Sequence, residues 1–141
     1  IADGHEIATH GYSHRNMARM SRAECEEEWE KAEHVLAEFG VQTDLFRPPG
    51  GAYSRSALDT VDEMGYKYIL WSWRLDTRDW SSPPADQVIN TVKQNVSDGS
   101  IILFHDYVAK QSPTPSALRE LIPYLKAEGY TFVTVSELIA F

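Results

Sequence analysis

The sequence has little cysteine, no long hydrophobic run and no excess of positive charge. Cys25 is the only cysteine among 141 residues, so the chain cannot form an internal disulfide. No apolar run approaches the roughly 18 residues that a membrane-spanning helix needs. Lysine and arginine number 13 against 21 aspartates and glutamates. The resulting net charge of -8 argues against nucleic-acid binding, because phosphate affinity comes mainly from clustered basic residues.

The chain also begins without a methionine, a basic leader or the apolar core of a signal peptide. We therefore expect that it begins inside a larger product. Apolar residues make up 43% of the sequence, which is enough for a packed core. Because this length is typical of one domain, we expect a single domain over residues 1–141.

Short apolar segments alternate with helical patterns along the chain. Strands are expected at residues 5–10, 45–46, 67–73, 100–105 and 131–135. Helices are expected between residues 21 and 40, 54 and 65, 82 and 99, 114 and 129, and from 136 onward. The run of carboxylates Glu26, Glu27, Glu28 and Glu30 is expected on a solvated helix face. This alternation predicts a parallel sheet with helices packed outside it.

Polar residues suited to chemistry follow the expected strands. They are His10 and His14 after the first, Arg47 after the second, Asp76 and Asp79 after the third, and His105 at the end of the fourth. In parallel α/β folds these loops gather on one face, where active sites lie. Their shared position therefore predicts one site.

His10 and His14 are four residues apart, a spacing that on a helical turn directs two imidazoles to one point and suits a divalent transition metal. Gly11 indicates a turn at this place, not the middle of a helix. Taken alone, the pattern is also that of two surface histidines.

The other segments have alternative interpretations as well. In Arg47–Gly51 (RPPGG) the two prolines fix the backbone and the two glycines that follow leave it flexible. A backbone amide in this loop can donate to an oxyanion. The alternative interpretation is a structural turn. In Asp76–Trp80 (DTRDW) the tryptophan can line a binding site for a sugar ring. In the alternative interpretation, the two carboxylates accept hydrogen bonds from loop amides and the tryptophan packs in the core. His105, after an apolar strand, can equally be a hydrogen-bonded core residue.

Together and in this order, the segments resemble the polysaccharide deacetylases with the NodB-homology domain, carbohydrate esterase family 4. Matches to four motifs of that family are His10–His14 (H-S/T-x-x-H), Arg47–Gly51 (R-P-P-Y/G-G), Asp76–Trp80 (D-x-x-D-W) and Leu103-x-His105 (L-x-H). The resemblance covers essentially the whole chain. It implies an α/β fold, a distorted (β/α)7 barrel that is incomplete at the N-terminus, and an exported bacterial protein that is extracellular or at the cell surface.

The resemblance also implies a role for each matched residue. His10 and His14 would bind a divalent metal, zinc first, with cobalt or another transition metal as the alternative. His105 would be the general acid and Asp79 would orient its ring. The remaining roles are Arg47 as the residue that orients the catalytic base, Gly50 as the amide donor to the oxyanion, and Trp80 and Leu103 as the lining of the groove for the substrate.

Three departures from the family pattern follow from the same comparison. Gly11 stands where the family has serine or threonine, and Gly50 where many members have tyrosine. The family's first motif, T-F-D-D, is absent, and no Asp-Asp pair occurs in the sequence. Its first aspartate would be the base and its second the third metal ligand. We therefore expect an upstream segment to supply both, and an open barrel seam that pairs with this complementary N-terminal segment or with a dimer partner.

The resemblance implies a polysaccharide substrate, namely N-acetylglucosamine units of peptidoglycan first, chitin-like polymers second and acetylxylan third. The alternative is a catalytically inactive carbohydrate-binding module, because the base is missing. A metal-dependent barrel hydrolase of small amides is a weaker hypothesis, since it does not explain the order of the motifs. No nucleic acid or membrane span is expected.

Overall fold

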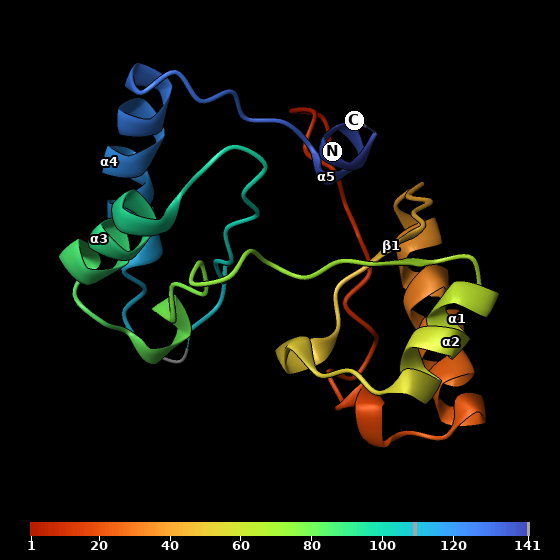
Figure 1. Cartoon of the computed structure of the whole chain (residues 1–141). Helices are drawn as coiled ribbons and strands as arrows, with labels where there is room; N and C mark the ends of the chain where they lie inside the picture. The colour runs from red at the N-terminus through yellow and green to blue at the C-terminus, as the bar shows by residue number, and fades with distance from the viewer. Residues whose placement is uncertain (109, 141) are drawn as a thin grey trace. The chain divides into compact units, whose positions relative to one another are not determined.

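The structure, a computed structural model, describes residues 1–108 and 110–140 (Figure 1). The chain divides into two compact units, Ile1–Leu70 and Trp71–Phe141, and each has its own hydrophobic core. The expectation of one domain over residues 1–141 stays a prediction. In the described ranges, no helix is both long and apolar enough to cross a bilayer.

The first unit combines two α-helices with a small parallel sheet. Its elements, with η for a 3-10 helix, are η1 (Met17–Arg19), α1 (Arg22–Glu38), β1 (Leu45–Phe46), η2 (Pro49–Gly51), α2 (Arg55–Glu63) and β2 (Lys67–Tyr68). β1 and β2 pair in parallel, and Phe46 lies opposite Tyr68. Phe46 also forms an isolated parallel bridge with Thr9. Three extended segments therefore run in parallel, with β1 in the middle.

Local sequence explains where α1 begins and ends. The Ser21 hydroxyl accepts a hydrogen bond from the Glu24 amide, and the Glu24 carboxylate accepts one from the Ser21 amide at 2.9 Å. After the helix, Gly40 has a φ of 69° and its amide donates to the Ala37 carbonyl. The prediction of a helix between Ser21 and Gly40 is confirmed.

An aromatic cluster holds this unit together. The Trp29 ring is fully buried, and its centroid lies 4.9 Å from that of Phe46 and 6.1 Å from that of Tyr66. Such aromatic pairs contribute roughly 0.5–1.5 kcal/mol beyond the area they bury. The other buried members of the cluster are Met17, Cys25 and Val61. Because η1, both helices and β1 all contribute, the core fixes the end of β1 and the loop that follows it.

The second unit is built on a helix pair. Its elements are η3 (Asp79–Ser81), α3 (Ala85–Asn95), α4 (Thr114–Ala127) and α5 (Val135–Ile139). α3 and α4 lie side by side (Figure 1). Their buried residues are Val88, Ile89 and Val92 from α3, and Ala117, Leu121 and Leu125 from α4. An isolated parallel bridge joins Asp76 to Leu103.

Most of the predicted strands are wrong in extent. Of residues 5–10 only Thr9 pairs, of 67–73 only Lys67–Tyr68 form a strand, of 100–105 only Leu103 pairs, and residues 131–134 form none. A strand needs the amides and carbonyls of a neighbour along its length, and an apolar run alone does not provide them. The chain then enters α5 at Val135, because Thr134 and Glu137 form a capping box.

The third helix begins later than predicted. We expected it at Ser82 and Pro83, but α3 begins at Ala85, with Pro84 as its N-cap. A residue that precedes a proline is disfavoured in the α region, which applies to both Ser82 and Pro83. Ser82 in fact has a φ of 57° and ends η3. The helix also ends at Asn95, before Gly99.

Candidate active site

The two predicted metal ligands lie on one bend of the first unit, after Thr9. The centroids of the His10 and His14 rings are 5.0 Å apart, with an interplanar angle of 74°. Gly11 has a φ of 76°, so the predicted turn is confirmed. His14 has a φ of 59°, which is uncommon for a residue with a side chain and is found preferentially at functional sites. The structure therefore brings the two imidazoles together on a strained loop.

The backbone of Arg47 fixes the protonation of His10. The Nδ1 atom of His10 lies 2.5 Å from the Arg47 carbonyl oxygen. A carbonyl only accepts, so Nδ1 carries a proton, and in the neutral ring Nε2 then presents its lone pair. The Arg47 amide in turn donates to the Thr9 carbonyl at 3.0 Å. Metal-bound histidines commonly donate their second ring nitrogen in this way, so His10 fits a metal ligand.

The ligand set formed by these residues is partial. Across the described residues, no cluster of three or more His, Cys, Asp or Glu side chains is placed to hold a metal ion. Protein zinc sites have three or four protein ligands. His10 and His14 together fit a divalent transition metal only with a further ligand.

The loop from Arg47 to Gly51 follows β1 directly. Pro48 and Pro49 are buried, while Gly50 is exposed and has a φ of 64°. The expectation of an unusual backbone at the glycines is therefore confirmed. A Cβ atom at Gly50 would meet no atom within 4 Å, so the position has room for a side chain and glycine is favoured by its dihedral angle. The proposed contact of the Gly50 amide with an oxyanion stays a prediction.

A buried carboxylate and a histidine form the centre of the second unit. Asp79 is fully buried, and its Oδ1 lies 2.7 Å from Nδ1 of His105. Its Oδ2 accepts the backbone N–H of His105 at 2.7 Å and the Thr114 hydroxyl at 2.6 Å. Burial raises the pKa of Asp79, but these hydrogen bonds outweigh it, and the pKa lies below its usual value. An ionised Asp79 therefore holds the ring, and Nε2 of His105 is available for proton transfer.

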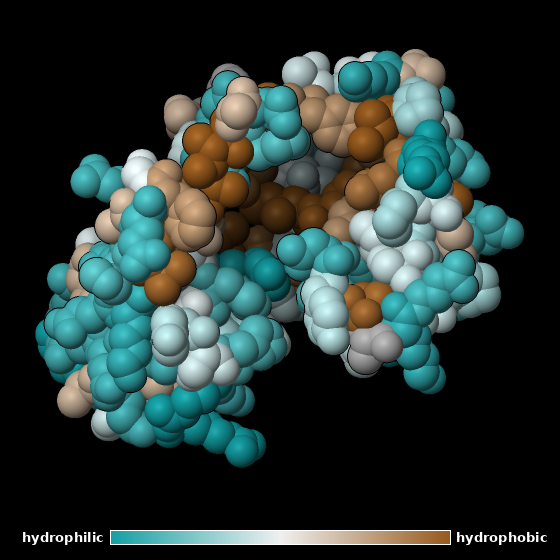
Figure 2. Space-filling model, turned by 180° about the vertical axis from the view of Figure 1, so that it is seen from behind, coloured by the Kyte–Doolittle hydropathy of each residue, from teal (hydrophilic) through white to brown (hydrophobic). Residues whose placement is uncertain are grey.

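The neighbouring predicted residues have mixed environments. Asp76 accepts the amide of Arg78 at 3.0 Å, so it has the loop-stabilising contact that was the alternative interpretation. Trp80 is 53% exposed, which excludes the interpretation as a core residue. Leu103 is buried and its carbonyl accepts the Thr77 hydroxyl. Hydrophobic residues are also visible on the molecular surface in Figure 2. Roles of Trp80 and Leu103 in lining a groove stay predictions.

Comparison with known proteins identifies the family. The family model described as polysaccharide deacetylase matches residues 1–69. A peptidoglycan-N-acetylglucosamine deacetylase of Bacillus cereus is 37% identical over 141 residues, which is 100% of this chain and 66% of the relative. The chain belongs to the polysaccharide deacetylase family, carbohydrate esterase family 4.

Solved structures of this family have the same fold. A family 4 acetyl xylan esterase from Clostridium thermocellum, in complex with a cobalt ion, superposes with a TM-score of 0.90 at 35% identity over 99% of this chain and 66% of that one. A pseudoenzyme of the family from Bacillus anthracis has a TM-score of 0.84 at 28% identity, over 94% and 46% of the two chains. The predicted fold class is confirmed. The chain spans about two thirds or less of the length of these deacetylase-family proteins.

Two polar residues of the chain were missed in the sequence. Thr114 was interpreted only as a helix start, and its hydroxyl binds Asp79. Glu28 was expected on a solvated face, which is wrong, because its side chain is buried and accepts hydrogen bonds from Tyr12 and Ser13. Helical spacing contained the signal for Glu28, since it lies three residues after buried Cys25. No sequence signal links Thr114 to Asp79.

Thr114→Val is expected to lower the free energy of unfolding by roughly 1.5–3 kcal/mol at neutral pH, because it removes a buried hydrogen bond to a charged group. It should also raise the pKa of Asp79, since the Thr114 hydrogen bond helps to lower that pKa. Urea unfolding measures the first effect, and carboxyl NMR titration the second. Thr91→Val, which removes a hydroxyl bonded to a helix carbonyl, is the control. Equal losses in both variants would contradict the prediction.

Proposed function

We propose that the chain is the major part of a metal-dependent hydrolase that removes acetyl groups from a polysaccharide. The observation that carries the proposal is the Asp79–His105 pair, in which a buried carboxylate orients the ring and leaves Nε2 available. We propose N-acetylglucosamine units of peptidoglycan as the first substrate class, because the Bacillus cereus relative is a peptidoglycan-N-acetylglucosamine deacetylase. Chitin-like polymers come second and acetylxylan third.

The proposed cofactor is a divalent transition metal, with zinc first and cobalt as the alternative. When bound, it would supply a Lewis acid for the acetyl carbonyl and lower the pKa of a bound water. His10 would hold it through Nε2, since Nδ1 is committed to the Arg47 carbonyl. His14 would be the second ligand. We propose that the third ligand and the catalytic base are an aspartate pair that precedes residue 1 in the longer protein.

In this proposal the remaining residues orient groups and move a proton. His105 protonates the leaving nitrogen or oxygen through Nε2, and Asp79 stabilises the imidazolium form before that transfer. Arg47 orients the base, and the Gly50 amide donates to the oxyanion of the tetrahedral intermediate. Trp80 and Leu103 line the groove for the sugar and the acetyl methyl. With such a polymer as the proposed substrate, we also propose that the protein acts outside the cell or at its surface.

A second candidate is a carbohydrate-binding module without turnover. Two observations favour it: the metal ligand set among the described residues is partial, and a structural neighbour is a pseudoenzyme. Under this hypothesis the Asp79–His105 pair would be a structural hydrogen bond only. Sugar polymers would still bind, but no acetate would be released.

Acetate release separates the two candidates. N-acetylglucosamine oligomers and peptidoglycan are incubated with added zinc or cobalt and either this chain or a longer form with the N-terminal aspartate pair. We expect acetate only from the longer form, and its loss in His105→Ala. Activity of this chain alone would place the base within residues 1–141. Binding without acetate in both forms would support the module.

A further inference from the structure

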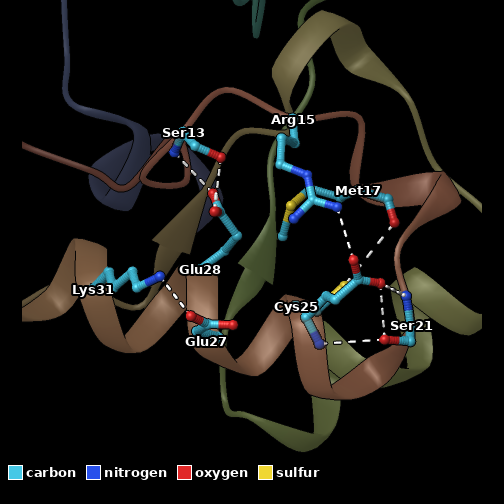
Figure 3. Close-up of polar contacts among 9 residues, drawn as sticks. Ser13, Arg15, Met17, Ser21, Cys25, Glu27, Glu28 and Lys31 are labelled. Atoms are coloured by element: carbon cyan, nitrogen blue, oxygen red, sulfur yellow. Dashed lines mark hydrogen bonds and ion pairs between the residues drawn. The ribbon is translucent and has the colours of Figure 1, made fainter.

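Glu28 connects the bend that carries His10 and His14 to the core of the first unit. In Figure 3 its carboxylate points toward Ser13. Its Oε2 accepts the Tyr12 amide at 3.2 Å and the Ser13 amide at 2.8 Å. Its Oε1 accepts the Ser13 hydroxyl at 2.7 Å. Both oxygens of one carboxylate thus accept hydrogen bonds from Tyr12 and Ser13, two of the three residues that lie between the histidines.

The side chain of Glu28 is held in place from its own helix. It is 5% exposed, and it lies on α1 between Cys25 and Trp29, which are both buried in the aromatic cluster. Burial raises the pKa of Glu28, but the hydrogen bonds from Ser13 and Tyr12 outweigh it, so that the pKa lies below its usual value. A rigid, ionised acceptor therefore faces the bend.

The bend needs such an acceptor because its backbone is strained. His14 has a φ of 59°, a left-handed conformation that is strained for an L-residue. The amides of Tyr12 and Ser13 would also lose their partners if the carboxylate were absent. The carboxylate lies close over Gly11 as well, since a Cβ there would be 3.7 Å from Oε2. The hydrogen bonds from Tyr12 and Ser13 to Glu28 therefore favour the observed bend over an extended one in which the imidazoles would be apart.

We propose that Glu28 is the positioning residue that holds His10 and His14 in one arrangement for a divalent metal. This inference rests on the proposed metal site. The carboxylate acts on the loop amides and the Ser13 hydroxyl, and it sets the positions of the rings through the chain between them. Outer partners that fix metal ligands typically contribute 10- to 100-fold to metal affinity.

The first test is metal affinity in the longer form that carries the N-terminal aspartate pair. Zinc affinity is measured by competition with a chromogenic chelator, and the visible spectrum is recorded with cobalt. We expect Glu28→Ala to weaken zinc binding about 10- to 100-fold and to change the cobalt spectrum. Glu28→Gln, which keeps one acceptor oxygen, should lose less. Glu30→Gln is the matched control, because it removes the same charge from an exposed position on α1. Far-UV circular dichroism verifies that each variant is folded.

The second test needs no metal. Amide hydrogen exchange of Tyr12 and Ser13 is followed by NMR, and we expect it to accelerate at least about tenfold in Glu28→Ala, since their acceptor is lost. Unchanged exchange, or zinc affinity within twofold of Glu30→Gln, would overturn the inference. If the unsubstituted longer form binds zinc no better than its His10→Ala variant, the proposed metal site fails, and exchange alone then decides whether Glu28 holds the bend.

Discussion

Replacing Asp79 by asparagine in the longer form is expected to lower the proposed deacetylase activity, measured as acetate release, about 10³- to 10⁴-fold, the size of effect that follows when a catalytic histidine loses its orienting carboxylate. Asp79 accepts from the His105 ring, the His105 amide and the Thr114 hydroxyl. An asparagine presents an NH₂ group where one oxygen stood, so at least one of these donors faces another donor. The ring then loses its fixed tautomer, and proton transfer from Nε2 becomes rare.

The same change should destabilise the second unit. Because Asp79 is fully buried, Asp79→Asn is expected to lower the free energy of unfolding by about 2–4 kcal/mol. Urea unfolding measures this loss, and Asp98→Asn is the control because Asp98 is exposed in the same unit. Equal stability of the two variants would show that the network around Asp79 contributes no net energy.

The pH dependence of stability gives an independent signature of Asp79. Its pKa is lower in the folded state than its usual value, so its stabilising contribution is complete above the unfolded pKa. That contribution is lost as the pH falls through the folded pKa, that is, below roughly pH 4. The unmodified chain should therefore lose stability in acid more steeply than Asp79→Asn. Parallel pH profiles would contradict an ionised Asp79.

The pairing of Asp79 with His105 could be anticipated from the sequence only through the family resemblance. Composition and periodicity placed both residues after strands, and the structure gives the reason for their proximity. Asp76 and Leu103 form a parallel bridge, so the segments that follow them leave the same edge. The same holds for His10 and Arg47 after the bridge between Thr9 and Phe46. The order of the motifs predicted which residues lie close together because segments that follow parallel paired residues leave the sheet at the same edge.

Other features were not predictable because they depend on tertiary contacts. The N-termini of α1 and α2 were predictable from Ser21 and Ser54, because their hydroxyls cap the first turn through local hydrogen bonds. Strand length depends on a neighbour, and the apolar run at residues 67–73 gives no information about that. Glu28 and Thr114 bind partners 15 and 35 residues away, and their residue types are ordinary for a helix and a helix start.

His10→Ala is expected to abolish the proposed metal-dependent deacetylation, with a loss of about 10³-fold or more. A Lewis-acidic metal contributes several kcal/mol to the transition state, and each 1.36 kcal/mol corresponds to a factor of ten in rate. The measurement is acetate release from N-acetylglucosamine oligomers in the longer form, together with zinc affinity.

Two comparisons identify the cause of that loss. His14→Ala removes an imidazole but leaves the hydrogen bond between His10 and the Arg47 carbonyl, so a similar loss in both variants indicates a missing ligand. His34→Ala removes an exposed histidine from α1 and should leave both zinc affinity and rate unchanged. If His10→Ala alone loses activity while its zinc affinity stays normal, His10 acts by holding the Arg47 loop, and the metal is bound elsewhere.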